Sequence, residues 1–278
     1  MEKMTKTMNH SVLRRFLTGR RVVGALVAGA VIGAGFALAS QPARAASLEA
    51  KEPEAVNWSF KGPFGTYDKS QLRRGFKVFK EVCSTCHSAH MLKFRNLSEE
   101  GGPAFTKAQV KVIAGEYTIE EMNGKGEMEE RPRLPKDPFP SPYDSPEQAA
   151  AVLGVAPPDL SVMAKAREGG PDHIHAILTG YQDPPEGLKM APGTHYNPYF
   201  PGRAIAMPPP LSADQVEYED GTKATLDQES RDVSAFLMWV AEPKLEARHE
   251  MGFQVMIYLI ALAGILYFAV RKVWSDVH

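Results

Sequence analysis

The chain contains only two cysteines, and they stand close enough together to bind a single group. Cys83 and Cys86 are followed directly by His87, which gives the pattern Cys-x-x-Cys-His. Two thiols at this spacing can bond the two vinyl groups of one porphyrin, and the next residue then presents an imidazole to the iron. The pattern therefore predicts one covalently bound haem c, with Cys83 and Cys86 as attachment points and His87 as an iron ligand.

A cysteine pair at this spacing also occurs in thioredoxin-type redox sites and in one half of a zinc site. A zinc site needs further Cys or His pairs at regular spacing, and the sequence contains none. A redox pair has no need of His87. Haem attachment is the interpretation that uses all three residues.

A carrier of single electrons usually has a second axial ligand, for which Met and His are the common choices. Met207 is the leading candidate because three prolines, residues 208–210, follow it. Consecutive prolines fix the backbone and hold the segment stiff and extended, which suits a loop that must present a thioether to iron. The alternatives that remain are Met190, His173, His175 and His195.

Two amphipathic helices are expected near the two ends of the central domain. Asp68 and Gln71 predict the start of the first helix, and Thr225 and Gln228 predict the start of the second, which Pro243 limits. The apolar stripe of the first helix consists of Leu72, Phe76, Phe79 and Val82. The stripe of the second consists of Val233, Phe236, Leu237 and Val240. In small c-type cytochromes a first and a last helix cross beside the haem, and these two helices fit that arrangement.

The first 45 residues have the pattern of a cleaved secretory signal peptide. Arginines at 14, 15, 20 and 21 precede an uncharged run over residues 22–39, and Ala43 and Ala45 supply the small residues that signal peptidase reads. The alternative is a permanent N-terminal membrane helix. Cleavage is expected after Ala45, which predicts a chain exported from the cytoplasm.

Residues 251–270 form a second uncharged segment, which predicts a membrane-spanning helix. At ~1.5 Å rise per residue this segment spans ~30 Å, the thickness of a hydrocarbon core. Arg271 and Lys272 follow it, and positive residues favour the cytoplasmic side. The alternative is a buried core helix.

These segments predict a single-pass protein of the inner (cytoplasmic) membrane. Its parts are a signal peptide (1–45), a periplasmic haem c domain (46–250), a transmembrane anchor (251–270) and a cytoplasmic tail (271–278). The domain over 46–250 has 23 basic and 31 acidic residues, a formal charge of −8. This charge argues against a nucleic-acid partner and allows electrostatic steering of a basic one, although it also suits a surface that only maintains solubility.

Several motifs resemble the cytochrome c1 family, the haem c subunits of the cytochrome bc1 complex. They occur in the family's order, and a single C-terminal anchor follows them. The motifs are residues 73–82 before the haem motif, 157–161 (PPDLS), 178–181 (LTGY), 196–202 (YNPYFPG), 206–209 (AMPP) and 232–243.

The resemblance implies a mainly α-helical, class I cytochrome c-like haem domain with long loop insertions. It implies that Cys83 and Cys86 hold the haem, that His87 and Met207 ligate the iron, and that Arg167 lies near a haem propionate. It further implies an electron carrier that takes part in enzyme activity as a subunit of a quinol–cytochrome c reductase, while activity of the isolated chain is left open. The implied partners are cytochrome b, the Rieske iron–sulfur protein as electron donor and a soluble c-type cytochrome as acceptor, in a dimeric multi-subunit complex.

Some features depart from the family or leave other functions open. Residues 152–154 (VLG) stand where the family often has Asn-Asn-Gly, and residues 116–146 are expected to form a long surface excursion. One alternative function is a free-standing membrane-anchored c-type cytochrome that serves an oxidase or a photosynthetic reaction centre. Such a shuttle needs a long linker, whereas residues 243–250 leave only eight residues. A haem peroxidase needs an open iron position, and the Met207 loop argues against one.

Overall fold

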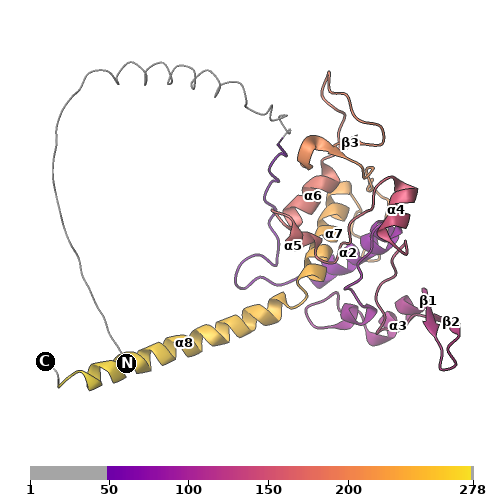
Figure 1. Ribbon diagram of the computed structural model, residues 1–278. Helices are drawn as coiled ribbons and strands as arrows, with labels where there is room; N and C mark the ends of the chain where they lie inside the picture. Colours follow the sequence, from indigo (N-terminus) through magenta and orange to yellow (C-terminus); the bar gives the residue numbers. More distant parts are fainter. Residues whose placement is uncertain (1–48, 277–278) are drawn as a thin grey trace, which may run out of the picture. The chain divides into compact units, whose positions relative to one another are not determined.

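Two helices that lie far apart in the sequence pack together at the centre of the fold. They are α2 (Lys69–Glu81) and α7 (Leu226–Ala241), which lie side by side in Figure 1. The computed structural model describes residues 49–276, so the predicted signal peptide lies outside the described residues. The described part is mainly helical, which confirms the predicted fold class.

Both helices begin where their capping residues predict. The Asp68 carboxylate accepts hydrogen bonds from the backbone N–H groups of Ser70 and Gln71, and the Thr225 hydroxyl accepts one from the N–H of Gln228. Each cap satisfies backbone donors that have no partner within the first turn of a helix. The predicted stripes of both helices face the core, where all but Val82 and Val240 are buried.

The two helices approach closely because α2 has a glycine at the point of contact. A Cβ atom added to Gly75 would lie 2.0 Å from the carbonyl oxygen of Asp232 and 2.7 Å from the Cβ of Phe236. Beside this contact Arg74 donates to both carboxylate oxygens of the buried Asp232, at 2.8 and 3.2 Å. The crossing therefore combines backbone contact with a bidentate, charge-assisted ion pair.

The remaining elements are short and are joined by long loops. In chain order they are η1 (Cys83–Thr85), η2 (Phe94–Ser98), α3 (Lys107–Gly115), β1 (Thr118–Met122), β2 (Met128–Pro132), α4 (Pro146–Leu153), α5 (Met163–Ala166), α6 (Pro171–Thr179), β3 (His195–Tyr196), η3 (Pro201–Arg203) and β4 (Ala204–Ile205). Strands β1 and β2 form one antiparallel pair and β3 and β4 form another. Helices α5 and α6 pack on α7 and position the loops of the site described below.

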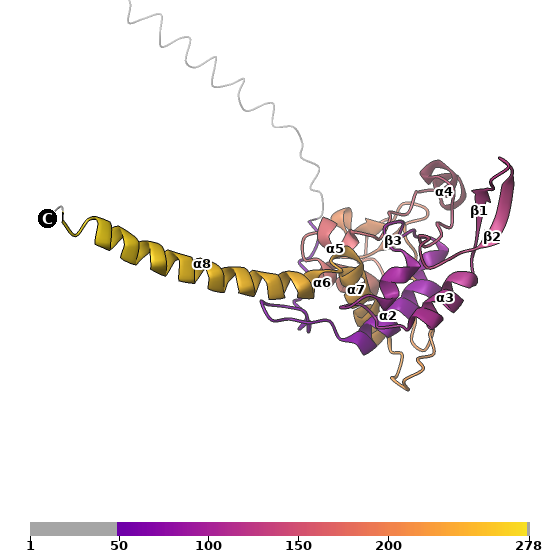
Figure 2. The same cartoon turned by 90° about the horizontal axis from the view of Figure 1, so that it is seen from below.

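The segment expected as a surface excursion, residues 116–146, has more structure than the sequence indicated. Strands β1 and β2 form an exposed hairpin within it, which was not predicted (Figure 2). The chain then returns to the core at Phe139, whose ring lies 4.3 Å from that of Phe94 and also contacts Phe76 and Phe79. The excursion is therefore anchored at its C-terminal end by a buried aromatic cluster.

Helix α8 (Leu245–Val273) is the one helix in the described range 49–276 that is long and apolar enough to cross a membrane. It begins six residues before the predicted span over 251–270, so residues 242–244 alone separate it from α7. Its first turn is attached to the domain, because the backbone N–H of Tyr67 donates to Glu246 at 2.7 Å. The expected eight-residue connection is therefore mostly helix.

Gly75→Ala should destabilise the domain by about 1–3 kcal/mol, because the added methyl group forces α2 and α7 apart. The free energy of unfolding, measured by denaturant titration of the detergent-solubilised holoprotein, checks this. Gly115→Ala is the matched control: it lies in α3, has open space around the added atom, and should be neutral or slightly stabilising. Equal stability of the two variants would contradict the close crossing.

Candidate haem site

The Cys-x-x-Cys-His motif follows directly on the C-terminal end of α2. Cys83 begins the short helix η1, and its carbonyl accepts hydrogen bonds from the N–H of Cys86 at 3.2 Å and of His87 at 2.9 Å. The three residues therefore occupy one tight turn. Both cysteines are half-buried and are not joined by a disulfide, and Cys83 packs against the core.

The environment of Cys83 disfavours the thiolate that a redox pair needs. Burial raises the pKa of the Cys83 thiol to about 12. A thioredoxin-type cysteine needs the opposite shift, because its thiolate is the nucleophile. For the zinc alternative, no group of three His, Cys, Asp or Glu side chains that could hold a metal is found within residues 49–276.

The imidazole of His87 is oriented by a backbone carbonyl. Its Nδ1 donates to the carbonyl oxygen of Pro158 at 2.8 Å, since a carbonyl can only accept. Nε2 then carries no proton and keeps its lone pair for a metal, as in histidine ligands whose other nitrogen is hydrogen-bonded. Burial lowers the pKa of His87, which favours the neutral imidazole that metal ligation needs.

The Pro158 carbonyl is itself held in place by Asp159. One carboxylate oxygen of Asp159 accepts from the Ser88 hydroxyl at 2.7 Å and from the His90 N–H at 3.0 Å, and the other accepts from the Ser161 N–H at 2.8 Å. Burial acts to raise the pKa of Asp159, but these hydrogen bonds outweigh it and hold the pKa well below its usual range. The PPDLS segment is thus fastened to the residues that follow His87.

Met207 lies on a separate part of the chain, two residues after β4. It is half-buried, and its carbonyl accepts a hydrogen bond from the Tyr181 hydroxyl at 3.0 Å. Pairing of β3 with β4 sets Tyr196 opposite Ala204 and so fixes the backbone that leads into the Met207 loop. The backbone that leads into the prolines is therefore fixed at β4 and again at Met207.

Close contacts give a physical role to the LTGY and YNPYFPG motifs. Asn197 is fully buried and donates from Nδ2 to the Ile177 carbonyl at 2.8 Å, which ties the β3 region to α6. A Cβ atom at Gly180 would lie 2.5 Å from the ring of Tyr199, so only glycine fits there. Sequence reasoning recognised these motifs by resemblance and did not assign their contacts.

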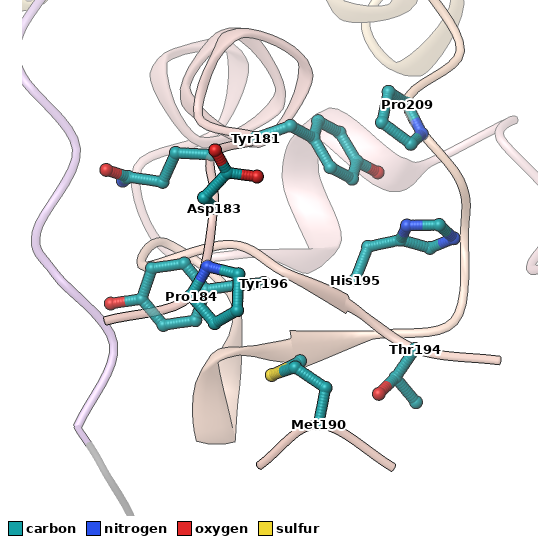
Figure 3. Close-up of a pocket in the computed structure, with 9 residues that line it drawn as sticks. Tyr181, Asp183, Pro184, Met190, Thr194, His195, Tyr196 and Pro209 are labelled. Carbon is teal, nitrogen blue, oxygen red and sulfur yellow. The ribbon is translucent and has the colours of Figure 1, made fainter. Parts of the chain in front are cut away.

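Two of the alternative iron ligands line a pocket near the Met207 loop. Met190 and His195 face this cavity of about 420 Å³ together with Tyr181 and Pro209 (Figure 3). Proximity alone thus leaves both as rivals of Met207, and the choice of Met207 remains a prediction. The other histidines are placed differently.

His175 and His173 both lie on α6. The Nδ1 atom of His175 is 2.9 Å from the Ser230 hydroxyl of α7, which engages this histidine in packing between the two helices. His173 is half-buried, and burial together with the charge of Arg167 lowers its pKa. Arg167 itself is exposed at the end of α5, where it donates to the Ala166 carbonyl at 3.1 Å. Its role at a haem propionate remains a prediction.

The donor groups fit a haem c. A tight turn presents two thiols next to an imidazole whose orientation is fixed, and a stiff loop carries a thioether, the ligand type that raises haem potential. These groups belong to different segments, and each segment is attached to the same domain by its own hydrogen bonds. The fold and the site thus define a c-type haem domain joined to one apolar C-terminal helix.

Comparison with known proteins assigns the chain within this class. A sequence model of the Cytochrome C1 family matches residues 58–277. The chain is 42% identical over 270 residues to cytochrome c1 of Rhodospirillum rubrum, covering 91% of this chain and 98% of that relative. It is 40% identical over 275 residues to the "Cytochrome b-c1 complex catalytic subunit, mitochondrial" of Candida albicans, covering 98% and 94%. The chain therefore belongs to the cytochrome c1 family, and its cofactor is one haem c.

A longer relative belongs to the same set. The chain is 46% identical over 282 residues to "Cytochrome b/c1" of Bradyrhizobium diazoefficiens, a match that covers 94% of this chain but 41% of that relative. The chain thus spans less than half the length of this protein and nearly all of the other two. The resemblance predicted from the motifs is confirmed.

Asp159→Asn should destabilise the domain by about 1–3 kcal/mol at neutral pH, because an amide NH₂ would face donors that now reach a carboxylate. The folded pKa of Asp159 lies below its ordinary value of 3.8, so its contribution is present above that pH and lost as the pH falls below it. The gap to the unsubstituted protein should therefore shrink in acid.

Denaturant titrations at neutral and acidic pH measure this gap. Asp144→Asn is the control, because Asp144 is exposed and should show no such dependence. A gap that stays constant or widens in acid would contradict the assigned role of Asp159.

Proposed function

We propose that this chain is the electron-transfer subunit of a cytochrome bc1 complex. It accepts single electrons from the Rieske iron–sulfur protein and passes them to a soluble c-type cytochrome. Membership of the cytochrome c1 family supports the complex, and the names of two relatives, "Cytochrome b/c1" and "Cytochrome b-c1 complex catalytic subunit", support cytochrome b as a partner. The assembly is a dimer of multi-subunit units.

The short junction between α7 and α8 supports a subunit held in a complex over a free-standing shuttle. Only residues 242–244 separate the two helices, and Tyr67 binds both sides of the junction through Glu246 and the Glu242 carbonyl. A shuttle that carries electrons between distant partners needs a flexible linker of many residues. A domain held at one height above the membrane suits a relay within a complex.

The proposed topology follows from the two ends of the chain. Residues 1–45 act as a cleaved signal peptide, and α8 crosses the inner membrane once over residues 251–270. Arg271 and Lys272 in the last turn of α8 lie on the cytoplasmic side, as positive residues favour. The haem domain then lies on the periplasmic side, with the tail over 271–278 inside.

When bound, the haem c supplies an iron that alternates between its ferric and ferrous states and so carries one electron at a time. Cys83 and Cys86 would hold the haem covalently, and His87, whose ring the Pro158 carbonyl orients, would ligate the iron through Nε2. Met207 would supply a thioether ligand, the type that raises the haem potential. Arg167 neutralises a propionate. These residues fix position and potential, and no proton is transferred on this subunit.

Met207→Leu should leave the haem attached and lower its midpoint potential by a few tenths of a volt, within the ~0.8 V range that axial ligands cover. A redox titration of the purified holoprotein measures this. Met190→Leu is the matched control, because Met190 lines the nearby pocket and should leave the potential unchanged. An unchanged potential in the Met207 variant together with a fall in the control would make Met190 the ligand.

Purification of the tagged chain from membranes in mild detergent should recover b-type haem and an iron–sulfur protein with it. Added quinol should then reduce the c-type haem in an inhibitor-sensitive way, and a soluble c-type cytochrome should reoxidise it. Optical spectra of the recovered haems provide the measurement. Recovery of the chain with its own haem alone would support the free-standing carrier instead.

A further inference from the structure

A single aromatic side chain projects from the domain close to the start of α8. Phe64 is 80% exposed. It lies at the tip of the segment over residues 59–66, which we call the Phe64 loop. Figures 1 and 2 show the chain in this region running beside the first turns of α8.

The ring of Phe64 is in contact with the apolar part of α8. Its centroid lies 6.3 Å from that of Phe253, with the rings steeply inclined to one another. Phe253 stands two residues inside the uncharged span that begins at Met251, which is ~3 Å along the helix axis. Phe64 therefore lies at the level where α8 changes from charged to uncharged residues.

The Phe64 loop is held in this position by the chain on either side of it. The N–H of Thr66 donates to the Ser59 carbonyl at 3.1 Å and closes the loop. A Cβ atom at Gly65 would lie 2.3 Å from the carbonyl carbon of Phe60, so the loop can turn tightly only with glycine there. The adjoining Tyr67 is hydrogen-bonded to Glu242 and Glu246 at the helix junction. The fixed backbone of the loop thus keeps the phenyl ring of Phe64 exposed.

We propose that the Phe64 loop inserts into the surface of the bilayer and forms a second membrane contact beside α8. The argument rests on continuity: where α8 crosses a membrane, Phe253 lies at the lipid boundary, and a ring in contact with it shares the same surroundings. Phenylalanine on an amphipathic surface segment is a common means of insertion into the boundary between headgroups and acyl chains. The loop then limits rotation of the domain about the axis of α8.

The test uses spin labels on the assembled complex in lipid vesicles, and it rests on the proposed membrane helix. Cys83 and Cys86 are this chain's only cysteines and are joined to the haem, so a label on Phe64→Cys reports this position. The complex with the unsubstituted chain gives the background from other subunits. Collision rates with oxygen, which concentrates in lipid, and with a water-soluble nickel chelate define the surroundings of the label.

Two labelled controls calibrate the result. Leu259→Cys lies within α8, where oxygen should reach the label and the nickel chelate should not. Val112→Cys lies on an exposed surface of α3, where the chelate should reach it. Because Phe64 is exposed, its replacement should leave the haem spectrum unchanged.

The proposal expects the label at position 64 to resemble that at 259, with an oxygen-to-nickel collision ratio severalfold above that at 112. A ratio like that at 112 would place Phe64 in water and overturn the proposal. A label that neither reagent reaches would show that a protein surface covers Phe64, which also overturns it. If the label at 259 is open to nickel, the membrane helix itself fails, and that outcome is distinct from failure at 64 alone.

Discussion

The contact between the backbones of α2 and α7 is the constraint on which the other parts of this protein depend. Gly75 permits it, and the Arg74–Asp232 ion pair fixes its register. The haem-attachment turn follows α2 without an intervening loop, and α8 follows α7 after three residues. The crossing therefore sets where the haem-binding turn lies relative to the apolar helix, because both are direct continuations of the crossed pair.

The two sides of the site are built in different ways. On the histidine side, hydrogen bonds join a short turn to the PPDLS segment. His87 donates to the Pro158 carbonyl, and Ser88 donates to Asp159. At the Met207 loop, the predicted second side, a strand pair and the Tyr181 hydroxyl hold the backbone that leads into the three prolines. Each segment is thus held by its own hydrogen bonds.

Local signals in the sequence predicted the parts of the fold that depend on local interactions. The caps at Asp68 and Thr225 and the apolar stripes identified both central helices, because these signals act within one or two turns. The β1–β2 hairpin escaped prediction because its strands are acidic and do not alternate apolar with polar residues. The role of the Pro158 carbonyl could not be predicted from the sequence. Every residue has a backbone carbonyl, and only the fold determines which one accepts a hydrogen bond from His87. Resemblance identified the PPDLS motif, but only the structure shows that its Pro158 carbonyl orients the ring of His87.

The packing of α2 against α7 also has a kinetic consequence. The two helices stand at opposite ends of the domain, so their contact is among the last that a chain emerging N-terminal end first can form. Until α7 has emerged, the apolar face of α2 has only its contacts with Phe105 and Phe139, and the turn with Cys83 and Cys86 is less tightly packed. After the helices join, Cys83 is packed against the core. The fold thus leaves an interval, before α7 has emerged, in which a porphyrin can most easily reach both thiols.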